Sequence, residues 1–110
     1  MTDDQIWALD FLLDDHFALW DFADTFPNMR PDAANCQTSL LLDLVRKGLV
    51  EITFGRWFEN ETAPVSLETV HAALLDPASW SSTGREPGYV IGLTGSGRDV
   101  LRQRGVGLPL

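Results

Sequence analysis

Apolar and acidic positions alternate at helical spacing over residues 1–26. Thr2 followed by Gln5 makes a capping-box pattern, and Asp3 and Asp4 place negative charge at the positive end of a helix dipole. Neither Gly nor Pro interrupts this stretch. The pattern therefore predicts one long acidic N-terminal helix.

The side chains of this predicted helix divide into a narrow acidic stripe and a wide apolar arc. At about 100° per residue, the stripe consists of Asp3, Asp10, Asp14 and Asp21. Ile, Leu, Trp and Phe fill most of the remaining surface. Because one packed layer covers a narrower arc, we expect a second chain or the insertion described below to cover the rest. If a second chain covers the arc, the protein either forms a homodimer or binds this helix in a groove of a partner.

Two prolines, Pro27 and Pro31, end the first helix, since proline cannot continue one. A second helix is expected to begin at Asn35 or Thr38 and to end at Gly48, a residue that readily takes the left-handed C-terminal conformation. Its expected buried face consists of Leu40, Leu41, Leu44 and Val45. Residues 49–57 follow as a strand of β-branched and aromatic residues.

Residues 58–87 form an insertion that is too long for a hairpin loop, and the sequence predicts a helix within it. Ser66 is the expected N-cap of that helix. Its apolar face comprises Leu67, Val70, Ala73 and Leu74. A returning strand is expected from Tyr89, followed by a last helix that is capped by Thr94 or Ser96. The apolar tail, residues 106–110, is expected either to dock on the domain or to fray.

Four segments resemble the core of winged-helix domains, which occur in bacterial transcription regulators. They are TSLLLDLVRKGL (residues 38–49), VEITF (50–54), YVIGLT (89–94) and GRDVL (97–101). The resemblance lies in their order: a helix ending at KGLV, a strand, a returning strand ending in LT, and a short helix. It implies a single α+β domain of winged-helix type. We divide it into the acidic helix (1–26), the central helix and first wing strand (32–57), the insertion (58–87), and the second wing strand with the last helix (88–105).

The same resemblance implies a DNA-binding transcription regulator as one candidate function. In a DNA-reading member, the helix that ends at Lys47 would enter the major groove. Its base-edge candidates would be Gln37, Thr38, Ser39 and Asp43, with Arg46, Lys47, Arg56 and Arg85 on phosphates.

Three features of the chain depart from a DNA-reading winged helix. The first helix of a helix-turn-helix would occupy residues 26–37, where two prolines leave room for little more than one turn. The reading helix has no Arg or Lys near its N-terminal end, and the folded insertion replaces a simple wing.

The charge distribution also disfavours nucleic acid. The net charge is −8, and residues 1–45 hold nine acidic residues against one base, whereas residues 46–110 hold seven of each. Such a domain repels a phosphate backbone over about a Debye length, roughly 8 to 10 Å. We therefore expect a non-enzymatic protein-interaction domain that dimerises or binds and neutralises a basic protein. Its expected partner-binding residues are Asp10, Asp14 and Asp21, with Trp57 and Trp80 flanking the insertion.

Catalytic and cofactor motifs are missing from the sequence. His16 and His71 lie in predicted apolar helices and are interpreted as packed or surface residues, and Cys36 has no His or Lys beside it. The glycines of residues 92–98 lack the spacing of a P-loop or a dinucleotide loop. We predict no catalytic residue, cofactor or metal. No targeting segment or apolar run of about 20 residues occurs, so a soluble cytoplasmic protein is expected.

Overall fold

The computed structural model describes residues 2–56, 61–80 and 88–104, with only the backbone of residues 56 and 61–64. Its elements are α1 (Asp3–Phe11), β1 (Phe17–Ala18), α2 (Leu19–Thr25), the 3₁₀ helix η1 (Pro27–Met29), α3 (Thr38–Arg46), β2 (Val50–Arg56), β3 (Glu61–Pro64), α4 (Leu67–Leu74), the 3₁₀ helix η3 (Pro77–Trp80), β4 (Gly88–Leu93) and α5 (Gly95–Gln103). The predicted α+β class is confirmed.

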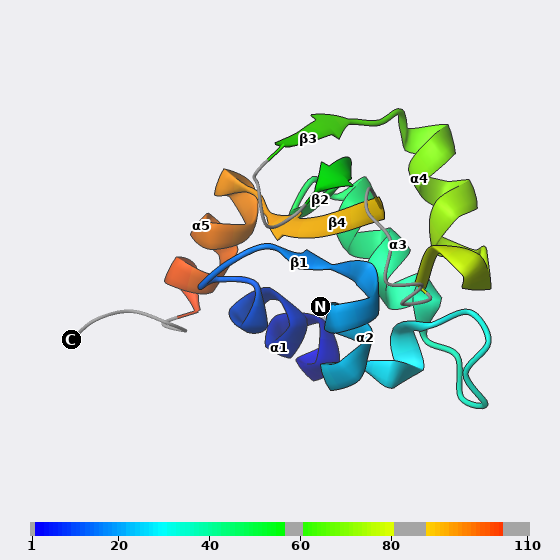
Figure 1. Cartoon of the computed structure of the whole chain (residues 1–110). Coiled ribbons are helices and arrows are strands. Elements are labelled where there is room, and N and C mark those ends of the chain that lie inside the picture. The colour runs from blue at the N-terminus through cyan, green and yellow to red at the C-terminus, as the bar shows by residue number, and fades with distance from the viewer. Residues whose placement is uncertain (1, 57–60, 81–87, 105–110) are drawn as a thin grey trace.

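The four described strands form one antiparallel sheet in the order β1, β4, β2, β3. Ile91 of the central strand β4 pairs with Phe17 on one side and with Ile52 on the other. Figure 1 shows α1 and α2 below the sheet, with α3 and α5 towards its two ends and α4 beside α3. The buried core joins Ile52 and Ile91 to the helices through Leu9, Leu12, Leu19, Phe22, Leu41, Leu44, Leu74 and Leu101.

The prediction of one long N-terminal helix is wrong. Helix α1 ends at Phe11, the short strand β1 follows, and α2 begins only at Leu19. The Asp15 carboxylate accepts a hydrogen bond from the backbone N–H of His16 at 2.8 Å. A side chain that bonds a neighbouring N–H in this way competes with the helical hydrogen bond of that residue. The stripe of aspartates is consequently divided between two helices and the connection between them.

The fold-back of α2 covers most of the apolar arc within the same chain. Phe11 stacks on Phe17 with ring centroids 4.5 Å apart, and it meets the edge of Phe26 at 5.5 Å. Phe22 packs on Phe26 at 4.8 Å. Aromatic pairs at these separations gain free energy beyond that of burial alone. The arc therefore needs neither a second chain nor the insertion as its main cover, although Trp7 stays 60% exposed.

The central helix begins and ends, and the last helix begins, where the sequence predicts. Helix α3 is followed by Gly48, whose φ of 72° is the left-handed conformation expected at a helix C-terminus. Thr94, one of the two expected caps, accepts the N–H of Gly97 at the start of α5. Between α2 and α3, residues 26–37 contain only the single turn η1, in agreement with the two prolines.

The insertion lies between β2 and β4, two strands that pair directly with each other. Its predicted helix is α4, and the Ser66 side chain accepts the N–H of Thr69 as its cap. The strand β3, which extends the sheet beyond β2, was not predicted. Because α4 contacts α3 (Figure 1), the insertion covers part of the helix that a DNA-reading domain would leave open.

Candidate functional site

An apolar groove separates α3 from α4. It encloses about 380 Å³ and is lined by Leu42, Val45 and Arg46 of α3 and by Leu67, Glu68 and His71 of α4. The α3 residues are spaced i, i+3, i+4, and Leu67 and His71 are spaced i, i+4, so each set lies on one helix face. We call this set of six residues the α3–α4 groove.

Leu67 is 58% exposed at the edge of the α3–α4 groove, although the sequence pattern assigned it to the buried face of its helix. That part of the prediction is wrong, while Val70, Ala73 and Leu74 are buried as expected. The error has a recognisable source. Leu67 is the first residue of α4, where the chain enters the helix before its core-facing turn begins.

The rims of the α3–α4 groove carry opposite charges. Arg46 stands on the α3 rim and Glu68 on the α4 rim, and both are exposed. Within the described part of the chain, neither forms an ion pair. The groove is therefore apolar in the middle, basic on one side and acidic on the other.

The residues proposed for base contacts occupy different environments in the structure. Thr38 is buried, with its hydroxyl donating to the Met29 carbonyl at 2.7 Å, so its predicted contact with a base edge is wrong. Gln37 is the half-buried N-cap of α3, and Ser39 is exposed. Of these three residues, only Ser39 is exposed at the start of the helix, and the fourth candidate, Asp43, is partly exposed and paired with Lys47.

The phosphate candidates at the end of α3 are only partly available. The Lys47 ammonium lies 2.9 Å from the carboxylate of Asp43, one turn earlier on the helix. The hydrogen bond from Lys47, and to a smaller extent the one from Gln5, lowers the pKa of Asp43. Arg46 is exposed beside the α3–α4 groove. Arg56 is described only by its backbone in β2, and Arg85 lies outside the described residues.

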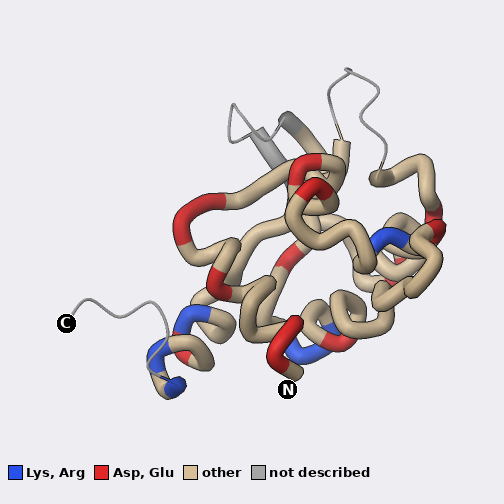
Figure 2. Tube along the Cα trace, turned by 90° about the horizontal axis from the view of Figure 1, so that it is seen from below, with Lys and Arg blue, Asp and Glu red and all other residues tan. Residues whose placement is uncertain are grey.

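The acidic partner candidates lie on the layer formed by α1, α2 and the connection between them, residues 12–18. Asp10 and Asp14 are exposed and Asp21 is half-buried. Residues 1–29 contain seven aspartates and no Lys or Arg, and none of the seven makes an ion pair with Lys or Arg in the described ranges. Figure 2 shows acidic positions spread over this layer and a group of basic positions on α5, with further basic positions in other parts of the chain.

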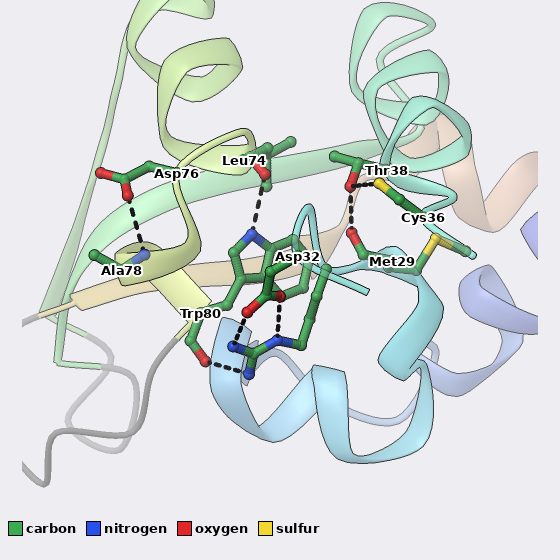
Figure 3. A network of polar contacts seen from close by, with 9 residues as sticks. Met29, Asp32, Cys36, Thr38, Leu74, Asp76, Ala78 and Trp80 are labelled. Atoms are coloured by element: carbon green, nitrogen blue, oxygen red, sulfur yellow. Dashed lines mark hydrogen bonds and ion pairs between the residues drawn. The ribbon is translucent and has the colours of Figure 1, made fainter. Parts of the chain in front are cut away.

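The two tryptophan candidates give different outcomes. Trp80 is completely buried, and its indole N–H donates to the Leu74 carbonyl at 3.1 Å, so its predicted role as a surface anchor is wrong. Arg30 donates hydrogen bonds to Asp32 and to the Trp80 carbonyl, and these bonds tie η3 of the insertion to the segment before α3. Figure 3 shows Asp32 and Trp80 close together at this point. Trp57 lies outside the described residues.

A polar pocket of about 290 Å³ brings His16 close to several charged side chains. Its lining includes Asp14 and Asp15 of the connection, Glu51 of β2 and Arg98 of α5. The His16 imidazole lies 3.1 Å from the Asp15 carboxylate. The side chains of Asp15 and His16 are 61% and 31% exposed. Water therefore screens the interaction between these two side chains.

Neither Glu51 nor Arg98 was a candidate, because they come from elements that only the tertiary structure brings to the connection. Among the described residues, no group of three or more His, Cys, Asp or Glu side chains is arranged to hold a metal ion. Cys36 is exposed, and its thiol lies 3.1 Å from the Thr38 hydroxyl. No described helix has the length and apolar character that crossing a membrane requires.

Comparisons with known proteins add no relative: no family model, no curated protein and no solved structure matches this chain.

Proposed function

We propose that this chain is a non-enzymatic protein-interaction domain of winged-helix-like architecture. The observation that carries the proposal is the α3–α4 groove. In a DNA reader, the outward face of α3 would present polar and basic groups, whereas here Leu42 and Val45 open beside the exposed Leu67. Contiguous exposed apolar surface with a polar rim marks a protein contact.

The winged-helix interpretation is supported by the order of elements around the sheet. Helix α3, strand β2, its antiparallel neighbour β4 and helix α5 follow one another as the sequence resemblance implies, apart from the insertion. The separation of α2 from α3 by residues 26–37 exceeds the three-to-four-residue turn typical of a helix-turn-helix. This departure weakens the case for DNA reading and leaves the architecture intact.

The alternative is a DNA-binding transcription regulator. Arg46 and Lys47 at the end of α3 would have to supply its phosphate contacts, but Lys47 is already paired with Asp43. A mobility-shift experiment with pooled duplex DNA at about 50 mM salt, where phosphate contacts are strongest, tests this alternative. We expect no shift. A shift that weakens steeply with salt and disappears in the double variant Arg46→Ala, Lys47→Ala would establish DNA binding and overturn the proposal.

A basic protein is the partner that the acidic layer of α1 and α2 would suit. The support is the seven aspartates of residues 1–29, none of which forms an ion pair with Lys or Arg in the described ranges. Reversal of Asp10, Asp14 and Asp21 to Lys tests this surface separately from the groove, with polylysine as the probe. Equal retention of wild type and triple variant on the probe would rule out the acidic layer as a binding surface.

A further inference from the structure

We infer that the occupant of the α3–α4 groove is a second copy of this chain, related to the first by a two-fold axis. The inference rests on the proposed protein-interaction function and specifies its partner. Its basis is the combination of an exposed apolar centre with two rims of opposite charge, Arg46 on α3 and Glu68 on α4.

The rim charges restrict what the groove can bind. A partner of uniformly basic character would pair with Glu68 but would be repelled by Arg46, and a uniformly acidic partner would show the reverse. An occupant must therefore present an acidic group and a basic group on opposite sides of exposed apolar side chains. The α3–α4 face of this chain carries these two charges, and Leu67, which is 58% exposed at its edge, supplies the apolar side chain that enters the groove of the other copy.

A two-fold axis through the centre of the groove satisfies both charges at once. In a two-fold interface, if residue i contacts residue j, then j contacts i. Arg46 of each copy would therefore meet Glu68 of the other, and the two Leu67 side chains would fill the apolar centre together with Leu42 and Val45. A stable interface buries about 1,200 to 2,000 Å² in total, so the contact extends along both helices beyond the groove itself.

The net charge of −8 on each copy opposes this association. Long-range repulsion between the copies is screened at about 0.15 M salt, where the Debye length is about 8 Å, whereas the direct Arg46 to Glu68 contacts are shorter than that. The dimer is therefore expected at physiological salt.

Sedimentation equilibrium of the full chain at that salt, from roughly 1 µM to roughly 1 mM protein, measures the association. We expect a monomer–dimer equilibrium. Leu67→Asp should raise the dimer Kd at least about tenfold, because it places two carboxylates in the apolar centre. Its fold should survive, since Leu67 is exposed and an acidic residue in the first turn of α4 interacts favourably with the helix dipole.

Charge reversal at the rims identifies a second copy as the occupant. Arg46→Glu alone and Glu68→Arg alone each place like charges in both rim contacts, so each variant should dimerise more weakly than wild type. When the two single variants are mixed, both contacts of the mixed pair join opposite charges, and a heterodimer should form at near wild-type affinity. Arg104→Glu, the same charge change at the exposed C-cap of α5, is the matched control and should leave the Kd unchanged.

Two results would overturn the inference. One is a wild-type chain that stays monomeric throughout this concentration range. The other is a dimer that is insensitive to Leu67→Asp and to both rim reversals, since that dimer would use another face. Either result leaves the proposed function to be judged by the DNA experiment, so the two failures are distinguishable.

Discussion

The side-chain amide of Gln5 donates a hydrogen bond to the carboxylate of Asp43 at 3.0 Å and so joins α1 to α3. The same amide nitrogen donates to the Leu40 carbonyl at 3.0 Å, and the Gln5 oxygen accepts the N–H of Thr2. Gln5 is 3% exposed. One side chain therefore completes the capping box of the first helix and also fixes the position of that helix on the central one.

The first prediction separates these two roles with Gln5→Glu. Glutamate can still accept the Thr2 N–H in a capping box, but it has no amide donor and places a second carboxylate beside Asp43. We expect a loss of about 1 to 3 kcal/mol in the free energy of unfolding at pH 7, measured by urea titration. The loss should shrink on acidification as one carboxylate takes up a proton. An equal loss at all pH values would show that the missing amide hydrogen bonds to Leu40 and Asp43, and not repulsion between the two carboxylates, cause it.

The second prediction concerns the pH dependence that Asp43 imposes on stability. Hydrogen bonds from Lys47 and Gln5 lower the pKa of Asp43 below its ordinary value of 3.8. A carboxyl whose pKa is lowered in the folded state contributes stability above its unfolded pKa and loses it as pH falls through its folded pKa. Urea titrations should therefore show wild type more stable than Asp43→Asn at pH 6, with the gap closing below about pH 4. A pH-independent gap would mean that the ion pair is not its source.

The third prediction compares one substitution at two tryptophans. Trp80→Phe removes the buried indole donor and leaves the Leu74 carbonyl without it, which should cost about 1 to 3 kcal/mol, with a further loss from the space left in the core. Trp7→Phe changes a side chain that is 60% exposed and should stay within about 0.5 kcal/mol of wild type. Thermal and urea unfolding followed by circular dichroism measure both. Similar losses at the two sites would contradict the burial of Trp80.

The fourth prediction uses two glycines in the first turn of α5. A Cβ at Gly97 would overlap the Leu49 carbonyl oxygen and the Leu93 side chain, whereas nothing lies within 4 Å of a Cβ at Gly95. Gly97→Ala should therefore destabilise the chain by about 1 to 3 kcal/mol, because backbone has to shift. Gly95→Ala should be neutral or stabilise it by up to about 1 kcal/mol, because the unfolded chain loses freedom. Equal effects of the two substitutions would show that α5 does not approach Leu49 closely.

The end of the central helix and the caps of α4 and α5 could be predicted from neighbouring residues. The helix that ends at Gly48, the Ser66 cap and the Thr94 cap were all recognisable because each depends on residues within one turn of it. The long N-terminal helix was mispredicted for the opposite reason. No Gly or Pro separates Phe11 from Leu19, and the aromatic contacts that make the fold-back favourable join Trp7 and Phe11 of α1 to Phe26, which follows α2.

The candidate site was predictable only in outline. Arg46, Leu67 and the insertion helix could be placed on their own elements from the sequence, but their meeting across one groove could not. The burial of Thr38 and Trp80 was equally hidden, since each depends on a hydrogen bond that its environment supplies: Thr38 to Met29 and Trp80 to Leu74. A polar or amphipathic side chain is as suited to a surface as to a buried position with a partner, so its type alone does not decide between them.

The α+β class, the position of the central helix, the cap of the last helix and the concentration of negative charge in the N-terminal part could all be predicted from the sequence. These depend on short-range backbone preferences and on composition. The structure was needed to show that α2 folds back on α1, that α4 covers one side of α3, and that Arg46 and Glu68 line the same apolar groove. The physical reason is that burial is a property of surfaces that meet in space, and such surfaces come from residues distant in the chain.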